Sequence, residues 1–399
     1  MNKALKGIKI LDISRILAGP YCTQVLSDLG ASVTKVESLT GDDTRKLGPP
    51  FIGSESAYFL STNRGKKSVC VNLKDGRGQK IVQHLAAEAD VVVENFKTGD
   101  LARYGLDYGS IVATNPGVVY ASITGYGQTG ARAKEPAVDT TLQGMTGLMS
   151  ITGERDGPPV KAGLAVIDML TGQLAVIGIL SALRERDVSG KGQHIDLSLF
   201  DVGLMSMTNV AQNYLATGET PLKFGSEHPQ IVPFQAFQAK DAGWFMLAAV
   251  NDDQFRRLGE VCNSPRLQSD PRYVTNADRM ANKPELIELL KSIFVSQERS
   301  YWLHKITEAG ISIAPINTVE EALGDPQAVF RGVEWHLEHP TIGDLPVMAN
   351  ALQHMSRTPA QPQGPPPLLG EHTREVLQEF MSNEEIETLV LDGVVALGP

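Results

Sequence analysis

A single carboxyl group interrupts a long apolar stretch of the sequence. Asp168 stands in the run from Gly163 to Gly172, where almost all neighbours are aliphatic or glycine. An extended segment is expected to turn here into a helix that continues to Arg186. The positive end of its dipole would keep the Asp168 carboxylate ionised while the apolar neighbours exclude water, and such a carboxylate is a competent covalent nucleophile. An Asp at this place is equally suited to be an ordinary N-cap, and the spacing by itself does not decide between the two roles.

Basic side chains recur near the ends of the predicted strands. In an acidic protein they predict a local anion site, suited to the several phosphates of a large cofactor. The alternative is a solvated charged face, which such residues form more often. These residues are Lys35, Arg45, Arg64, Lys66, Lys67, Lys74, Lys97 and Arg103.

Other catalytic chemistries lack their motifs. His228 lies in a turn-rich segment without the spacing of a metal-ligand set, and Cys22 and Cys70 are expected to be packing residues. No GxSxG sequence is present. The turn after the first predicted strand, Ser14–Pro20, has one glycine where a dinucleotide fingerprint needs three. We therefore predict no metal site, but the helix N-terminus after that strand remains a place where a phosphate or carbonyl oxygen can meet backbone N–H groups.

The composition restricts the class of protein. The chain has 399 residues, and its 42% hydrophobic and 21% charged residues are typical of a globular protein. Lys and Arg total 36 against 46 Asp and Glu, and the net charge of -10 argues against a nucleic-acid-binding protein. Three cysteines far apart predict a reducing compartment. The short segment before the first strand leaves no room for a leader, so we expect a cytoplasmic protein.

The segment 162–183 is long and apolar enough to cross a bilayer. However, Asp168 lies within it, and an Asp near the centre of a membrane helix costs about 2.5 to 3.5 kcal/mol on insertion scales. No second span accompanies it. We therefore expect a buried core helix and no membrane association.

Strand and helix signals alternate over the first half of the chain. This alternation predicts a parallel, doubly wound sheet with helices on both faces. The expected strands are 8–13, 33–37, 68–73, 91–94, 118–123 and 194–198, and the expected helices include 19–30, 76–88 and 168–186.

The composition changes near residue 210. Residues 210–233 are rich in turn formers and predict a linker or functional loop. Residues 234–328 are expected to form a smaller α+β domain that includes a β-hairpin. Beyond it, the proline-rich segment 359–367 must be extended, and a helix over 373–381 is expected to close the chain.

Several motifs, in order along nearly the whole chain, resemble those of the family III CoA-transferases (CaiB/BaiF type), the group of the formyl-CoA and carnitine CoA-transferases. The segments Glu55–Ser56, Asn63–Arg64 and Ile231–Phe237 look most like the succinate–hydroxymethylglutarate CoA-transferases, which use dicarboxylates. The motifs that carry the family resemblance are Gly7–Asp12, Leu17–Pro20, Lys35–Glu37, Gly41–Arg45, Val93–Phe96, Ile123–Gly130, Gly190–Asp196 and Pro367–Thr373.

The resemblance implies a fold and a set of site residues. It implies an interlocked homodimer in which residues 1–209 and 329–399 form a large Rossmann-like domain around the smaller central domain. Asp168 matches the family nucleophile, Arg64 a position able to hold the distal carboxylate of a dicarboxylic acid, and the loop from Gly225 to His228 a segment that closes over the active site. The positions that match CoA contacts are Leu17, Ala18, Lys74, Asn95, Phe96, Arg103, Ala137 and Asp139.

The implied activity is transfer of CoA from an acyl-CoA donor, succinyl-CoA in this subgroup, to a dicarboxylic acid such as glutarate or hydroxymethylglutarate. The reaction would pass through aspartyl anhydride and aspartyl-CoA thioester intermediates, with a coenzyme A thioester as substrate and no tightly bound cofactor. Ser38 departs from the family pattern where some relatives have Arg, which puts one phosphate contact in doubt. Val138 stands where the racemase branch has a second catalytic base, His, so the alternative of a 2-methylacyl-CoA racemase loses its chemistry. An inactive CoA-binding homologue is the other alternative.

Overall fold

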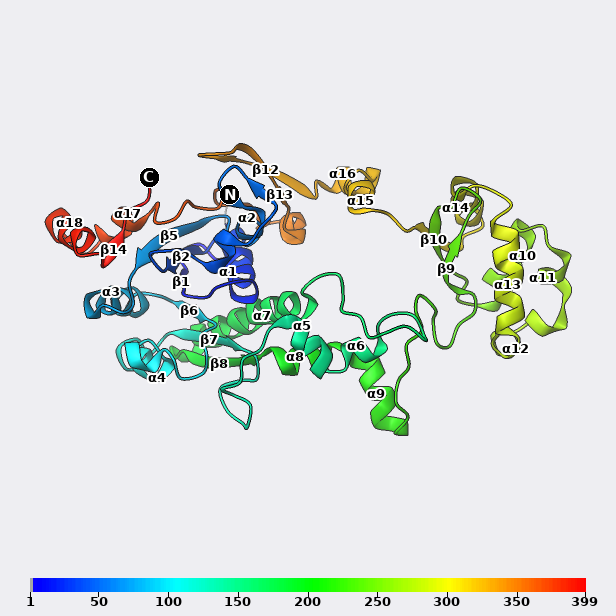
Figure 1. Ribbon diagram of the computed structural model, residues 1–399, viewed down its shortest axis with the longest axis horizontal. Helices are drawn as coiled ribbons and strands as arrows, with labels where there is room; N and C mark the ends of the chain where they lie inside the picture. Colours follow the sequence, from blue (N-terminus) through cyan, green and yellow to red (C-terminus); the bar gives the residue numbers. More distant parts are fainter. Residues whose placement is uncertain (1–2) are drawn as a thin grey trace. The chain divides into compact units, whose positions relative to one another are not determined.

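The computed structural model describes residues 3–399 (Figure 1), and the chain divides into two compact units. The large unit contains residues 3–148, Ala162–Gln212 and Val329–Pro399, and the small unit contains Met149–Lys161 and Asn213–Ala328. The sequence placed the boundaries after residues 209 and 328 and left 149–161 in the large domain. That segment joins the small unit because the Gly225 N–H donates to the Gly153 carbonyl at 3.0 Å and Lys223 Nζ donates to the Gly157 carbonyl.

The large unit is built on a seven-stranded sheet in the order β14-β5-β2-β1-β6-β7-β8. All neighbours pair in parallel except β14, which is antiparallel to β5, so the prediction of a mostly parallel α/β sheet is confirmed. The order runs outward from β1 in both directions, and ligands of such sheets bind where it reverses, at the carboxyl ends of the strands. The strands are β1 (Lys9–Asp12), β2 (Ser32–Glu37), β5 (Lys66–Val71), β6 (Val91–Glu94), β7 (Val119–Thr124), β8 (Gln193–Ser198) and β14 (Val395–Ala396).

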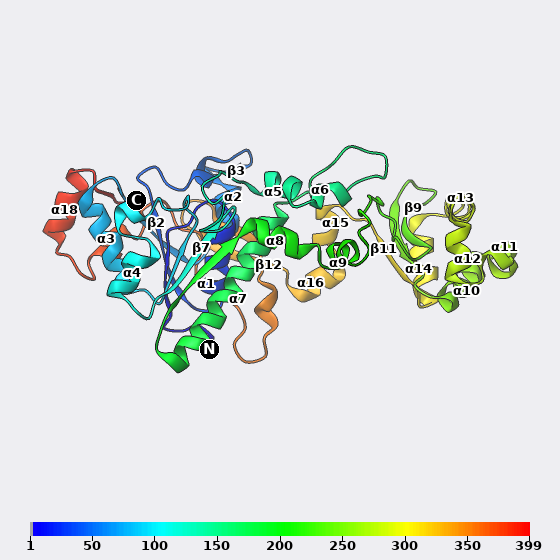
Figure 2. The ribbon, with the colours of Figure 1, turned by 90° about the horizontal axis from the view of Figure 1, so that it is seen from below.

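Helices cover both faces of this sheet, because apolar side chains alternate between the faces along each strand. Val92 packs into one apolar core, and Val91 and Val93 pack into the other. The first core includes residues of α3 (Gly76–Ala87), α4 (Tyr108–Thr114), α17 (Thr373–Leu377) and α18 (Asn383–Leu391). The second includes residues of α1 (Ala18–Asp28), α5 (Asp139–Met145), α7 (Val166–Ser189) and α8 (Leu199–Ser206) (Figure 2).

Among the described residues, α7 is the one helix long and apolar enough to cross a membrane by length and composition. It packs closely on α1 and on the sheet, as predicted for a core helix. Gly172 permits this approach, since a Cβ added there would lie 2.7 Å from the Ala18 carbonyl oxygen and 2.9 Å from the Tyr21 ring. The first turn of α1 therefore lies against the second turn of α7.

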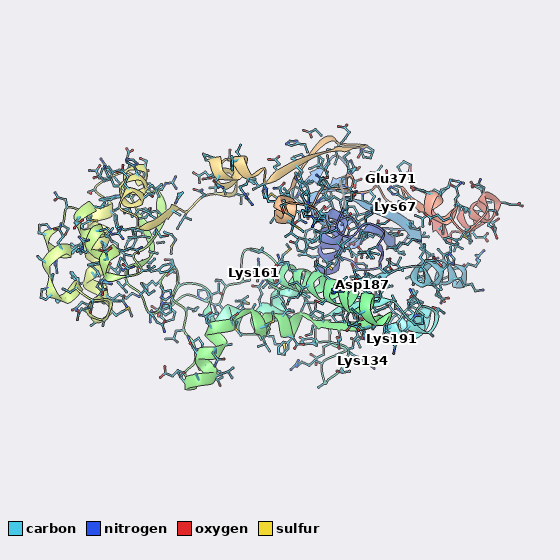
Figure 3. The ribbon with its side chains drawn as sticks, turned by 180° about the vertical axis from the view of Figure 1, so that it is seen from behind. Lys67, Lys134, Lys161, Asp187, Lys191 and Glu371 are labelled. Carbon is cyan, nitrogen blue, oxygen red and sulfur yellow. The ribbon has the colours of Figure 1, made fainter. Side chains whose placement is uncertain are left out.

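The C-terminal segment returns to the sheet, so that Lys67 on β5 and Glu371 line one hollow of the large unit (Figure 3). The prediction of one closing helix over 373–381 is wrong. Helix α17 ends at Leu377, and Ser382 and Glu385 form a capping box that starts α18. This S-x-x-E signal was readable in the sequence.

The large unit also contains elements outside the seven-stranded sheet and the helices named above. They are β3 (Phe51–Ile52), β4 (Glu55–Ser56), α2 (Ala57–Thr62), α6 (Leu148–Ile151), α9 (Thr208–Thr217), α16 (Pro326–Arg331), β12 (Glu334–His339) and β13 (Gly343–Met348), and α6, α9 and α16 each cross a unit boundary. Short 3-10 turns occupy Asp43–Lys46, Ala102–Tyr104, Pro271–Tyr273 and Ala351–His354.

The small unit combines a three-stranded antiparallel sheet with helices around one aromatic core. Phe237, Phe245, Phe294 and Trp302 form this core and are all buried. Its elements are β9 (Phe234–Gln238), β10 (Trp244–Ala248), α10 (Asp252–Val261), α11 (Pro265–Ser269), α12 (Asn276–Ala281), α13 (Lys283–Phe294), α14 (Arg299–Glu308), β11 (Ser312–Pro315) and α15 (Val319–Leu323).

Candidate active site

Asp168 is the third residue of α7 and is partly exposed. It is not the N-cap, which is Ala165, so the structural alternative is wrong. The capping acceptor comes instead from α5, where Asp139 Oδ2 accepts the N–H of Ile167 at 2.8 Å and the N–H of Asp168 at 3.1 Å. Within residues 3–399, no hydrogen bond or ion pair engages the Asp168 carboxyl itself. The side chain is therefore free to react.

Asp139 is held rigidly in this capping position. Its side chain is buried at 5% exposure, and its second oxygen accepts from Gln143 Nε2, whose own carbonyl oxygen accepts the Ala162 N–H at 2.8 Å. Ala137 also packs into the core on this face. The predicted CoA contacts of Asp139 and Ala137 stay predictions, and the structure adds to Asp139 the role of fixing the first turn of α7.

The protonation of Asp168 differs from the expectation. Burial and, after it, the negative charge of Asp139 raise the pKa of Asp168 to about 7. The sequence predicted an ionised carboxylate, whereas with this pKa the carboxylate is only partly ionised near neutral pH, because burial and a like charge both disfavour the charged form. The charges of Asp168 and Asp139 also act on Tyr58 of α2, because burial and then these two carboxylates raise its pKa. Sequence reasoning missed Tyr58, and no motif singles it out.

The N-terminus of α1 offers backbone donors beside α7. Leu17 is its N-cap and supplies no side-chain hydrogen bond, and Pro20 has no N–H. The N–H groups of Ala18 and Gly19 have no acceptor in the described part of the chain, as is usual for a first turn. Gly172 lets α7 approach the Ala18 carbonyl oxygen, so the first turn of α1, which carries these free donors, packs against the helix of Asp168.

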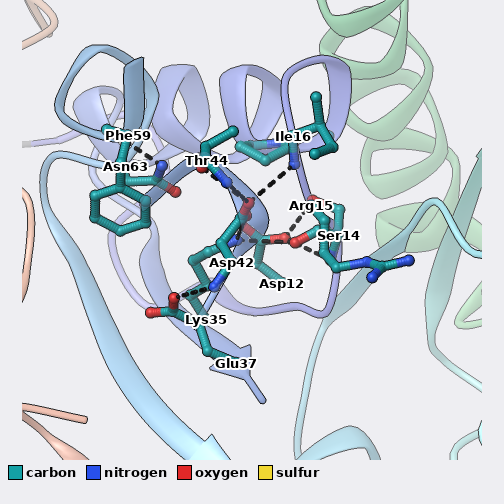
Figure 4. Close-up of polar contacts among 12 residues, drawn as sticks. Asp12, Ser14, Arg15, Ile16, Lys35, Glu37, Asp42, Thr44, Phe59 and Asn63 are labelled. Carbon is teal, nitrogen blue, oxygen red and sulfur yellow. Dashed lines mark hydrogen bonds and ion pairs between the residues drawn. The ribbon is translucent and has the colours of Figure 1, made fainter. Parts of the chain in front are cut away.

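A buried network of charges lies beneath this turn (Figure 4). Lys66 Nζ is 3.0 Å from Asp12 Oδ2, and Lys35 Nζ is 3.0 Å from Asp42 Oδ2, with all four side chains fully buried. Burial by itself would raise the pKa of Asp12, but Lys66 and Lys35 outweigh it and the pKa is lowered. Burial lowers the pKa of Lys66 to about 8, against the opposing effect of Asp12.

Half of the eight basic residues in the predicted cluster are used inside the protein. Besides Lys35 and Lys66, Arg45 pairs with Glu37 at 2.8 Å and Arg64 pairs with Asp28 at 2.6 Å. These four cations have internal acidic partners, so they form neither an open anion site nor a solvated face. The sequence could not show this, because the partner of each cation comes from another element.

A cavity of about 410 Å³ opens at the carboxyl ends of β1, β2, β5 and β6, where the strand order reverses. Of the predicted CoA contacts, Lys74 and Phe96 line it, as does Ser38, the residue that departs from the family pattern. Arg15 adds a cation there, lying over the Phe96 ring at 5.0 Å. Asn95 borders this region with its amide bonded to the Arg15 backbone.

The other predicted site residues lie elsewhere. Leu17 and Arg64 line a second, largely apolar cavity of about 790 Å³. The Arg64 guanidinium also lies 5.1 Å from the centre of the Trp335 ring. Arg64 therefore already has two internal partners, Asp28 and Trp335, and its predicted role in binding dicarboxylates stays a prediction. Arg103 is exposed and lies near Asp100 at 3.9 Å.

Gly225 and His228 belong to the small unit. The His228 N–H donates to the Phe234 carbonyl at 2.9 Å, and its ring stacks on Phe234 with the ring centres 5.1 Å apart. The predicted closure of this loop over an active site stays a prediction. Within residues 3–399, no three His, Cys, Asp or Glu side chains are grouped as metal ligands would be.

Comparison with known proteins shows what class of protein carries this site. The model of CoA-transferase family III matches residues 5–373, so the chain belongs to this family and is a CoA-transferase that uses CoA thioesters as substrates.

Particular relatives are similar over most of their length. Succinyl-CoA:glutarate CoA-transferase of Mus musculus is 42% identical over 98% of this chain and 90% of its own. Succinate–glutarate CoA-transferase of Agrobacterium fabrum is 42% identical over 96% and 97%. The crystal structure of a CAIB/BAIF family protein from Brucella suis has a TM-score of 0.87 and 42% identity, covering 95% of this chain and all of that one.

Proposed function

We propose that this enzyme transfers CoA from succinyl-CoA to glutarate or a closely related dicarboxylic acid, with Asp168 as the nucleophile. The observation that carries the proposal is the reactive state of Asp168. Its N–H is fixed by Asp139, while its carboxyl has no hydrogen-bond or ion-pair partner among the described residues. The names of the relatives support the choice of donor and acceptor.

The reaction is an exchange of activated acyl groups. An Asp168 oxygen attacks the thioester carbonyl of succinyl-CoA, which forms a mixed anhydride and expels CoA thiolate. The thiolate attacks the aspartyl carbonyl, which forms an aspartyl-CoA thioester and releases succinate. A carboxylate oxygen of the acceptor attacks this thioester and frees the thiolate again. The thiolate then attacks the acceptor carbonyl of the second anhydride, which yields the new acyl-CoA and restores the Asp168 carboxylate.

The neighbours of Asp168 suit these steps. Attack requires the ionised carboxylate, and a pKa near 7 gives a carboxylate more basic than an ordinary Asp and still substantially ionised at neutral pH. Each tetrahedral intermediate carries an oxyanion, for which the free N–H groups of Ala18 and Gly19 are suitable donors. Exclusion of water protects the anhydrides, which is the role we propose for closure of the loop from Gly225 to His228.

We further propose that the enzyme is an interlocked homodimer in the cytoplasm. Large apolar side chains on α8 and α9 support a covered surface, with Met205 58% and Leu215 74% exposed in the single chain. Sedimentation of the intact protein should give twice the mass of one chain.

The test of the function is to trap the intermediate. The enzyme is mixed with succinyl-CoA and glutarate, quenched with hydroxylamine and digested, and the peptide containing Asp168 should carry a hydroxamate. Product formation with an unmodified peptide would refute the mechanism. Exchange of label between succinate and succinyl-CoA separates an active enzyme from an inactive CoA-binding protein. Deuterium incorporated at C2 of a 2-methylacyl-CoA in D2O would instead indicate a racemase, for which the position of Val138 supplies no base.

A further inference from the structure

Ile16 has a backbone conformation that its residue type disfavours. Its φ is 71°, in the left-handed region, where a β-branched residue is a genuine outlier. Such conformations persist only where the surroundings hold them, and they concentrate at functional sites. Ile16 directly precedes Leu17, the N-cap of α1, whose first turn packs against α7 at Gly172.

The peptide between Arg15 and Ile16 is held from both sides. Asn95 Nδ2 donates to the Arg15 carbonyl at 2.6 Å. The Ile16 N–H donates to Asp42 Oδ1 at 3.4 Å (Figure 4). Asn95 Oδ1 also accepts the Arg15 N–H at 2.8 Å. These contacts come from the loop after β6 and from the turn after β2, so two parts of the sheet edge converge on one peptide.

The residue before this peptide is fixed as well. Lys35 Nζ donates to the Ser14 carbonyl at 2.8 Å while it pairs with Asp42. Ser14 Oγ and the Ser14 N–H both bond to Asp12 Oδ1. The chain therefore enters α1 from a rigid base, and the left-handed turn at Ile16 sets the direction in which the Ala18 and Gly19 N–H groups point.

We infer that Asn95 and Asp42 are positioning residues for CoA transfer, which hold the Arg15–Ile16 peptide and thereby aim the first-turn N–H groups of α1 at the reacting carbonyl. This inference rests on the proposed function, in which those groups stabilise the oxyanions. It assigns to the Asn95 amide a role through the backbone that is distinct from a contact with CoA.

The test uses Asn95, because Asn95 is partly exposed, whereas loss of Asp42 would leave Lys35 buried and unpaired. Asn95→Ala should lower kcat about 10- to 100-fold with a smaller change in KM for succinyl-CoA, since a small misplacement of catalytic donors has effects of that size. The double variant Asn95→Ala/Ile16→Gly should recover a large part of kcat, because glycine adopts the left-handed conformation without strain. Ile16→Gly alone is the reference, and Thr98→Ala, on the same loop, is the control that should keep its activity.

Two results would overturn the inference. One is a raised KM with unchanged kcat in Asn95→Ala, which would make Asn95 a CoA contact only. The other is a double variant as slow as Asn95→Ala, although thermal denaturation shows both to be folded. Failure of the proposed function is recognised separately, because Asp168→Asn would then retain transfer activity whatever the Asn95 variants do.

Discussion

Two aspartates of the large unit stand in opposite electrostatic surroundings. Asp12, at the end of β1, faces Lys66 and Lys35 and accepts hydrogen bonds from Ser14 and Thr23, so its pKa is lowered. Asp168, in the first turn of α7, has another carboxylate as its charged neighbour, and its pKa is raised to about 7. The first carboxyl is fully satisfied and stabilises the fold, while the second has no partner and is available for chemistry. Loss of water acts to raise the pKa of both carboxyls, so the neighbouring charges decide the direction of the net shift.

The largest expected effect is on activity. Asp168→Asn should lower the rate of CoA transfer by about 10³-fold or more, because the nucleophile is lost. Thermal denaturation should show that the fold is kept, since the carboxyl has no partner to lose. Asp187→Asn, at the exposed far end of the same helix (Figure 3), is the matched control and should keep full activity. If Asp168→Asn and Asp187→Asn transferred CoA at comparable rates, Asp168 would not be the nucleophile, and its proposed difference in role from Asp12 would be refuted.

The second effect is on stability at the other aspartate. Lys66→Met should lower the free energy of unfolding by about 3 to 5 kcal/mol, because it leaves the Asp12 charge buried with one partner fewer. Lys67→Met, one residue along, breaks only a half-exposed pair with Glu375 and should change stability by less than about 1 kcal/mol. Urea denaturation of both variants measures the difference. Equal losses of unfolding free energy in the two variants would show that the buried Asp12–Lys66 pair stabilises the fold no more than the half-exposed pair does.

The pH dependence of stability should differ in sign between the two sites. Folded Asp168 keeps its proton up to about pH 7, whereas the unfolded chain loses it near pH 4, so the contribution of Asp168 to stability falls as the pH rises between these values. Asp12, with its lowered pKa, contributes stability that is present above about pH 4 and is lost in acid.

Asp168→Asn should therefore gain stability over the parent protein between pH 5 and pH 8, by about 1 to 2 kcal/mol after allowing for the partial exposure of the carboxyl. Denaturation across this pH range measures it. A difference that is constant with pH would contradict the raised pKa.

The smallest expected effect comes from changing Asp139, the charged neighbour that helps to raise the pKa of Asp168. Asp139→Asn keeps an oxygen acceptor for the Ile167 and Asp168 N–H groups but removes the negative charge. The acidic limb of the profile of kcat/KM against pH should move to lower pH, which raises the activity at pH 6 relative to pH 8 by about threefold to fivefold. A profile that keeps its position would mean that burial alone sets the pKa of Asp168.

Local sequence patterns were sufficient to predict the central sheet and its longest helix. Alternating strand and helix signals predicted the parallel strands β1, β2, β5, β6, β7 and β8, and the apolar run predicted α7 as a core helix. The short C-terminal elements were missed, because β14 has two residues and its place depends on pairing with β5. The segment 149–161 was misassigned because its bonds are to residues near 225, a contact between distant parts of the chain.

The sequence by itself determined the parallel sheet, the helix that carries Asp168 and, through its motifs, the family. The tertiary structure alone decided that Asp139 caps that helix, that Lys35, Lys66, Arg45 and Arg64 are paired internally, and that Ile16 is held in a left-handed turn. The physical reason is the distance along the chain over which each kind of interaction acts. Periodicity and motifs act between near neighbours along the chain, whereas a pKa or a strained peptide depends on charges and donors brought together from separate strands.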